Sequence, residues 1–278
     1  MLRDIVRFRF VRVMASQHEQ LDQRNYSTNE TFSLLLDPSY VYCGMTYLPP
    51  PRNLLAIIYL HNDQHILELR QPDNDNLTLV RSIELSEIPS TIDDFVWCDE
   101  RNEFLLISHG HLLTYNLDQE RLTNRLLIDH EGNKYHLAYN SNWIVCVDSR
   151  TLRLYELQTL NYVRQKRLDH VCEDIEYDDR YFLSTHTGKF EVLDRTLFSI
   201  RRFAIGGTTI CRFNSKLWLI ADAFDDRLLW HSLDKLLLTI PHIHQPKSMV
   251  VIPTISRIVI QCTDPNRLLI YDPIKSDA

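Results

Sequence analysis

Glycine is scarce in this sequence, and the motifs that accompany catalysis are missing. Only 6 of the 278 residues are glycine, and none belongs to a Gly-rich loop of the kind that cradles a phosphate. The sequence has no GxSxG elbow, no HExxH pair and no CxxC pair. Without these signatures of nucleotide-dependent enzymes, serine hydrolases and zinc proteins, the sequence favours a binding protein that uses no cofactor over an enzyme.

Long apolar runs are also missing. No stretch approaches the roughly 18 apolar residues that a membrane-spanning helix needs. Arg3, Arg7, Arg9 and Arg12 interrupt the apolar start of the chain, which leaves no secretory signal. An Arg-rich start is also typical of mitochondrial presequences, but this one contains Asp4 and alternates like a strand. We therefore expect a cytoplasmic protein, with the nucleus as an alternative.

Basic residues are fewer than acidic ones in this chain. The chain has 30 Lys and Arg against 37 Asp and Glu, a net charge of −7, and its isoelectric point is near 5.9. A general binder of nucleic acid or of anionic membranes would carry an excess of basic residues. Nucleic acid and membranes are therefore not expected partners.

The cysteines follow the apolar pattern rather than a metal-binding one. Each lies in or beside an apolar, strand-like run, at Cys43, Cys98, Cys146, Cys172, Cys211 and Cys262. A cysteine in such a run behaves as a small hydrophobic residue. We expect reduced, buried thiols.

A sequence pattern typical of a β-hairpin recurs along the chain. WIVCVDSRTLRLYEL at 143–157 aligns with VIQCTDPNRLLIYDP at 259–273 after a shift of 116 residues, without a gap. Each copy is an apolar run, an acidic turn and a second alternating run, which is typical of two strands joined by a turn. Weaker copies occupy 54–69, 103–117, 181–194 and 217–233.

Two further strands accompany each copy. A shorter strand that ends in a large residue precedes it, and another alternating strand follows most copies. The large residues are Tyr47, Trp97, Tyr139, Tyr177, Phe213 and Ile252, with spacings of 50, 42, 38, 36 and 39 residues. Four short antiparallel strands recurring about every forty residues predict an all-β protein, a six-bladed β-propeller of four-stranded blades.

The sixth copy ends without room for its fourth strand. FSLLLD at 32–37 has the pattern of that strand. If this N-terminal strand completes the last blade, the ring closes and no sheet edge stays open. We predict a flexible N-terminal arm over residues 1–31 and the propeller over 32–278, with Asp, Asn, Ser and Pro making the turns in place of glycine.

These hairpins resemble those of the NHL-repeat and YVTN-type propellers. The resemblance rests on the acids that begin the turns, Asp148, Asp222 and Asp264, and on Asn266 and Arg267. The aromatic strand ends, such as Tyr271, resemble those of WD-repeat blades. The resemblance implies a propeller that presents loops to a partner, and it assigns the turn acids a structural role.

Ionisable residues cluster at one position of the repeat, the start of each innermost strand. In a propeller these strands line the central channel. Blades two to four place four carboxylates, a histidine and a tyrosine there: Asp93, Asp94, Tyr135, His136, Glu173 and Asp174. Blades five, six and one place small or apolar groups there: Thr209, Ile210, Ser248, Met249, Cys43 and Gly44. The six polar residues predict a binding site at one mouth of the channel, although strand starts are often polar without any ligand.

The expected function is non-catalytic. The sequence predicts a binding or scaffold module, a monomer, that presents a loop face to a protein or peptide partner, and the acidic mouth favours a basic one. One alternative is a metal-dependent, lactonase-like hydrolase that uses the mouth, because such six-bladed enzymes hold a divalent ion there. A second alternative is RNA binding, as in some NHL-type propellers.

Overall fold

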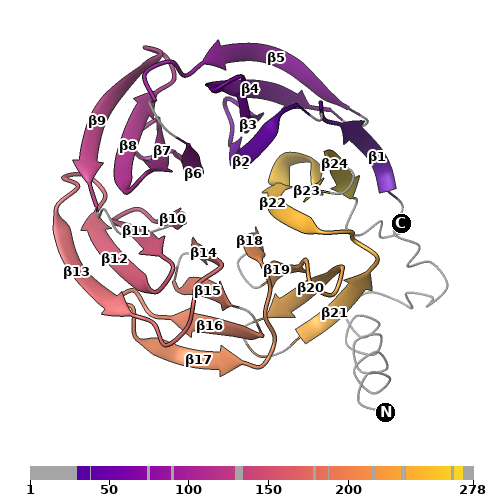
Figure 1. The fold of residues 1–278 in the computed structure, drawn as a ribbon. Coiled ribbons are helices and arrows are strands. Elements are labelled where there is room, and N and C mark those ends of the chain that lie inside the picture. The colour runs from indigo at the N-terminus through magenta and orange to yellow at the C-terminus, as the bar shows by residue number, and fades with distance from the viewer. Residues whose placement is uncertain are drawn as a thin grey trace.

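The computed structural model describes residues 30–271, apart from residues 38, 74–75, 89–90, 129–133, 178–179, 187, 215–216, 233, 235 and 264–265. It shows six four-stranded antiparallel sheets arranged as the blades of a ring, with β2, β6, β10, β14, β18 and β22 nearest its centre (Figure 1). The predicted six-bladed β-propeller is confirmed. Within the described residues, no helix has the length and apolar character to cross a membrane.

The first three blades run in chain order from the channel outward. Blade 1 consists of β2 (Val41–Leu48), β3 (Leu54–His61), β4 (Gln64–Pro72) and β5 (Leu77–Glu84). Blade 2 consists of β6 (Ile92–Cys98), β7 (Glu103–Ser108), β8 (His111–Asn116) and β9 (Arg121–Leu127). Blade 3 consists of β10 (Tyr135–Tyr139), β11 (Trp143–Asp148), β12 (Thr151–Glu156) and β13 (Tyr162–Arg167).

The last three blades complete the ring. Blade 4 consists of β14 (Asp174–Tyr177), β15 (Phe182–His186), β16 (Lys189–Leu193) and β17 (Ser199–Phe203). Blade 5 consists of β18 (Thr209–Asn214), β19 (Leu217–Asp222), β20 (Arg227–Ser232) and β21 (Leu236–Pro241). Blade 6 consists of β22 (Pro246–Ile252), β23 (Arg257–Thr263), β24 (Asn266–Tyr271) and β1 (Glu30–Leu35), with a short 3-10 turn at Pro253–Ile255.

The N-terminal strand closes the ring, as predicted. Strand β1 pairs antiparallel with β24, with Leu35 opposite Arg267 and Leu34 opposite Leu268, and the Leu36 amide continues the ladder to the Asn266 carbonyl at 3.1 Å. The strand begins at Glu30, so the predicted boundary at residue 32 falls inside it. Residues 1–29, the rest of the predicted arm, lie outside the described residues.

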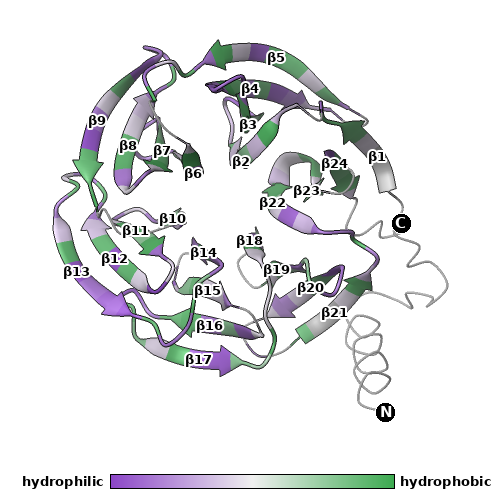
Figure 2. Cartoon of the chain, viewed as in Figure 1, coloured by the Kyte–Doolittle hydropathy of each residue, from purple (hydrophilic) through white to green (hydrophobic). Residues whose placement is uncertain are grey.

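The core lies between blades, because each sheet buries both faces against its neighbours. All six residues of β7 are buried, whereas outer strand β13 is mostly exposed and carries Arg and Lys. Figure 2 shows this gradient as purple, hydrophilic segments on the outer strands β9 and β13. One apolar cluster joins Leu67 of blade 1 to Phe95 and Trp97 of blade 2. Gly44 serves this packing, since a Cβ there would lie 3.0 Å from the Phe95 ring.

Asparagine and aspartate make many of the turns that glycine would otherwise make. Asn53, Asn62, Asp63, Asn102 and Asp226 all have φ between 48° and 61°. Short amide and carboxylate side chains tolerate this left-handed region better than other non-glycine residues. The prediction that polar residues replace glycine in the turns is therefore confirmed for these positions.

Candidate functional site

The three central residues of the predicted site come together at one level of the channel. Asp94 (β6), His136 (β10) and Asp174 (β14) lie on the innermost strands of blades 2, 3 and 4, and their ligand atoms all fall within 4.8 Å of one another. We call these three residues the mouth trio. Strand register explains the meeting, because each pairs with the equivalent residue of its own hairpin: Ile107, Val147 and Thr185.

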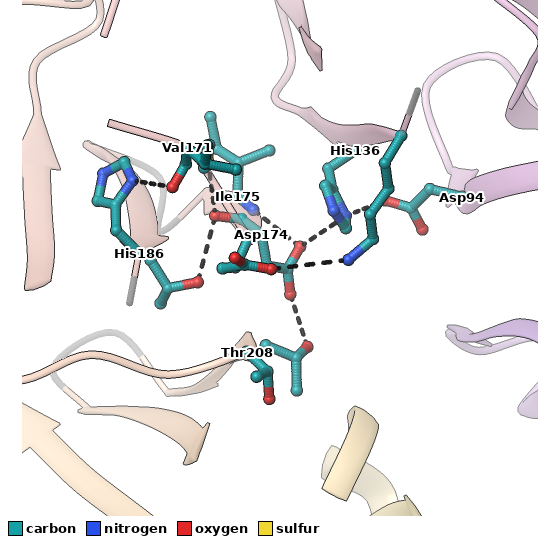
Figure 3. A network of polar contacts seen from close by, with 12 residues as sticks. Asp94, His136, Val171, Asp174, Ile175, His186 and Thr208 are labelled. Carbon is teal, nitrogen blue, oxygen red and sulfur yellow. Dashed lines mark hydrogen bonds and ion pairs between the residues drawn. The ribbon is translucent and has the colours of Figure 1, made fainter. Parts of the chain in front are cut away.

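His136 sits between the two carboxylates (Figure 3). Its Nδ1 atom lies 3.8 Å from Oδ2 of Asp94 and 3.6 Å from Oδ1 of Asp174. Its Nε2 atom is buried and has no hydrogen-bond partner among the described residues. A buried ring nitrogen without a partner costs free energy, which a ligand with a polar group can recover.

The two aspartates also join neighbouring blades. Asp94 accepts hydrogen bonds from the Phe95 amide at 2.8 Å and from the Leu137 amide of blade 3 at 2.9 Å. Asp174 joins blade 4 to blade 5 in the same way. It accepts bonds from the Ile175 amide (2.8 Å), the Thr209 hydroxyl (2.6 Å) and the Ile210 amide (2.9 Å). Each carboxylate therefore fastens its blade to the next one.

Asp93 and Glu173, which we call the rim pair, directly precede Asp94 and Asp174 in sequence. Asp93 accepts a hydrogen bond from the His109 amide at 3.3 Å, and burial raises the pKa of this carboxyl above its usual range. Glu173 lies 3.9 Å from Nζ of Lys134, and its side chain is about a quarter exposed. Both half-buried residues precede the aspartates of the trio in sequence, so they add negative charge to the same mouth.

The structure does not place the Tyr135 side chain at the mouth. This ring is only 2% exposed and packs with Leu105 and Ile107 in the core between blades 2 and 3. Successive residues of a regular strand point to opposite faces, so the neighbour of His136 on the regular strand β10 faces the core. Asp93 escapes this alternation because it lies at the register shift between Ile92 and Asp94, and Glu173 because it precedes β14. Tyr135 is therefore corrected from a site residue to a core residue.

In blade 5 the structure differs from the sequence alignment by one residue. Ile210 pairs with Ile220, and Thr209 takes the level of the trio by pairing with Ala221. Ile210 and Met249 are buried, at 3% and 6% exposure. A β-bulge explains the shift, since the register slips between Arg212 and Asn214.

Two charged residues of the channel were missed by the sequence analysis. Lys247 donates a hydrogen bond to the Tyr42 carbonyl at 3.3 Å, and burial, with repulsion from Lys134, lowers its pKa. Glu176 lies two residues after Asp174, on the same face of β14. Burial, reinforced by repulsion from Asp174, raises the pKa of Glu176 to about 8, although the Tyr177 amide (2.9 Å) and Arg212 act against this. The period of two from Asp174 was the signal that could have identified Glu176.

The turn acids occupy hairpin ends. Asp222 accepts bonds from the Phe224 amide at 3.2 Å and from both Nε and Nη2 of Arg227, at 2.9 and 2.7 Å. Asp148 pairs with the guanidinium of Arg153 across its hairpin. These contacts stabilise the turns from within. Asp264 lies outside the described residues.

Comparison with known proteins adds no family to this geometry. A scan against protein-family models and a search of curated proteins both find no match to the chain. What the fold itself establishes is a six-bladed β-propeller.

Proposed function

We propose that this protein is a non-catalytic binding module whose acidic mouth receives a lysine or arginine side chain of a protein or peptide partner. The observation that carries the proposal is the crowding of partly desolvated carboxylates at one end of the channel. The described residues there include five, Asp93, Asp94, Glu173, Asp174 and Glu176, alongside the cationic Lys134, Arg212 and Lys247.

The electrostatics of the carboxylates favour a cationic ligand. Burial raises the pKa of Asp93, Asp174 and Glu176, and neighbouring carboxylates add to the shift. A raised pKa means that the ionised form is under-stabilised, so a cation placed among these groups is bound with a favourable free energy. An ammonium or guanidinium group also supplies several N–H donors to the carboxylate oxygens.

A peptide cation suits the mouth better than Ca²⁺ or Mg²⁺. These ions need about six oxygen ligands, but Oδ2 of Asp174 already accepts two hydrogen bonds and both oxygens of Asp94 accept one. The second candidate is nevertheless a divalent ion on the mouth trio, as in a lactonase-like hydrolase, because its ligand atoms lie within 4.8 Å of one another. RNA is disfavoured, because these carboxylates repel phosphates.

The test is binding of a fluorescein-labelled peptide of lysine, arginine and alanine, followed by anisotropy. The rim variant Asp93→Asn with Glu173→Gln removes two charges without touching the hydrogen bonds between blades, and we expect it to weaken binding at least tenfold. The matched control is Asp234→Asn, which removes an exposed acid of blade 5 that pairs with Arg201 of blade 4, and it should bind as the wild type does. Equal binding by rim variant and wild type would contradict the proposal.

A metal arm separates the two candidates. Adding CaCl2 or MgCl2 to the wild-type protein should leave its melting temperature unchanged. A clear rise that disappears in the variant His136→Ala would favour the hydrolase instead.

A further inference from the structure

Two histidines and a glutamate converge where the connection from blade 3 meets blade 4, and none of them belongs to the mouth trio. His170 lies on the connection between β13 and β14, His186 ends β15, and Glu191 lies on β16. One ligand atom from each falls within 4.8 Å of the other two. We propose that these three residues bind a divalent transition-metal ion, with zinc as the best fit to the donor set.

The His186 ring is already arranged as a ligand. Its Nδ1 donates to the Val171 carbonyl at 2.8 Å (Figure 3), so Nε2 is the acceptor nitrogen, with the Ser184 hydroxyl 3.3 Å away as its hydrogen-bond donor. Metal-bound histidines commonly donate their second ring nitrogen to a backbone carbonyl, which fixes the tautomer and the ring orientation. Nε2 points toward Glu191, with Oε2 at 4.0 Å, and the side chains are only 1% and 2% exposed.

His170 supplies the second imidazole. Both of its ring nitrogens are buried and lack a hydrogen-bond partner within the described part of the chain. Its ring stands edge-on to the His186 ring, with centroids 3.5 Å apart. Two buried nitrogens without partners are costly, and coordination of one nitrogen removes part of that cost.

Glu191 supplies the carboxylate. Arg202 holds its Oε1 through Nε at 2.9 Å, so the other oxygen, Oε2, is the one turned to the histidines. Zinc takes histidine and carboxylate ligands at about 2.0–2.2 Å, which puts neighbouring ligand atoms about 3.3 Å apart in a tetrahedral site. A contraction of under 1 Å between His186 and Glu191 would reach that distance. The fourth position falls beside the Ser184 hydroxyl, which lies 3.3 Å from Nε2 of His186.

The enclosed position indicates a structural ion. Bound there, the metal ties the connection between blades 3 and 4 to the hairpin of blade 4. Glu173 and Asp174 follow His170 within four residues, so the same ion would steady one side of the acidic mouth. The donor set argues for zinc over calcium or magnesium, since imidazole suits transition metals and the harder ions prefer all-oxygen sites.

The experiment is titration of the purified, metal-stripped full chain with zinc sulfate, read by calorimetry and by the melting temperature. We expect one ion per chain with a dissociation constant in the micromolar range or tighter, a higher melting temperature with zinc, and no effect of magnesium. His170→Ala should weaken binding at least 100-fold, because it deletes a ligand and breaks no hydrogen bond of that ring. Two matched controls should bind zinc as the wild type does: His244→Ala, at an exposed histidine between blades 5 and 6, and His136→Ala, in the mouth trio.

Circular dichroism establishes that each variant is folded, and X-ray absorption at the zinc edge of the wild-type complex gives a result independent of any variant. The spectrum should report two imidazoles and oxygen ligands. Sulfur ligation, failure of the wild type to bind zinc, or equal binding by His170→Ala would overturn the proposal. Loss of zinc in His136→Ala would also overturn it, by moving the ion to the mouth. None of these outcomes depends on whether a basic peptide binds.

Discussion

The two halves of the ring fasten their blades together with different chemistry. In blades 2 to 4 the fasteners are carboxylates: Asp94 bonds the Leu137 amide, and Asp174 bonds the Ile210 amide. Between blades 1 and 2 and between blades 5 and 6 a neutral hydroxyl does the same work, and between blades 6 and 1 the Lys247 ammonium bonds the Tyr42 carbonyl. Thr46 accepts a bond from the Trp97 amide at 3.3 Å, and Thr208 donates one to the Pro246 carbonyl at 3.3 Å.

The comparison shows which property of Asp94 and Asp174 is needed to join blades and which is not. A hydroxyl is enough to join two blades, so the negative charge of Asp94 and Asp174 is not required by the propeller. Charged groups in a partly desolvated place destabilise the fold unless something neutralises them. Residues that break a local rule in this way tend to mark functional sites, and the acidic half-ring is where we place the function.

The largest effect is expected where the ring closes, in the other half. Deleting residues 1–38 removes β1 and exposes the edge of β24, and the melting temperature should fall by about 10 °C or more. Deleting residues 1–29 keeps the whole of β1 and should change the melting temperature little. Differential scanning calorimetry of the two truncations makes the comparison, and equal tolerance of both would contradict the closure of blade 6.

The closing strand illustrates what could be read from the sequence. The blades follow from strands of period two between polar turns, and the place of residues 32–37 follows from counting strands. The register could not be read in this way. One-residue bulges near Arg212 and Ser248 shift the alignment, and a shift of one residue exchanges inward and outward side chains.

The same reasoning decides which of the candidate site residues lie together in the structure. Asp94, His136 and Asp174 are level with one another because blades 2 to 4 keep a common register at that point. The prediction that Tyr135 faces the mouth was wrong, because side chains alternate along β10 and the Tyr135 ring faces the core. Lys247 was missed because it lies at a β-bulge, where this alternation is interrupted. His170, His186 and Glu191 come from three separate segments, so no local sequence spacing predicts that they form a cluster.

The second prediction compares the two kinds of fastener. Asp174→Ala leaves the Ile210 and Ile175 amides without their acceptor, so we expect a loss of about 2–4 kcal/mol in the free energy of unfolding. Thr46→Ala breaks one neutral bond and should cost about 1 kcal/mol. Urea denaturation of both variants gives the values. Equal costs would mean that the charge plays no special part in fastening the blades.

The third prediction concerns the cost of charge in the acidic half. The pKa of Glu176 is raised from 4.5 to about 8 in the folded state, so the folded protein holds this proton over a pH range in which the unfolded chain has released it. The free energy of unfolding therefore falls as the pH rises from about 4.5 to about 8, because the unfolded chain releases this proton more readily. Glu176→Gln should therefore raise the free energy of unfolding by up to about 4–5 kcal/mol at pH 8.5 and by little at pH 4.5.

Urea denaturation across this pH range tests the claim. A variant curve parallel to the wild-type curve would show that Glu176 titrates normally and that the channel does not desolvate it.

The smallest effect is kinetic and concerns the thiols. Cys43, beside the channel in blade 1, is half-buried, whereas the other five cysteines are buried. Burial raises the pKa of Cys43 to about 11, so even this thiol should react slowly at pH 7.5. With Ellman's reagent, one thiol should react slowly and the other five only after denaturation. Rapid reaction of several thiols in the native protein would contradict this packing of the blades.

The most direct test of the central claim is an unbiased peptide selection. A random peptide library is panned on the wild-type protein and, in parallel, on Asp94→Asn with Asp174→Asn, a variant that keeps the shape of both side chains and removes their charge. The proposed function predicts that the wild type enriches peptides with lysine or arginine at a fixed position and that the variant does not. Enrichment of the same peptides by both proteins, or of peptides without a basic residue, would contradict the assignment of binding to the acidic half-ring.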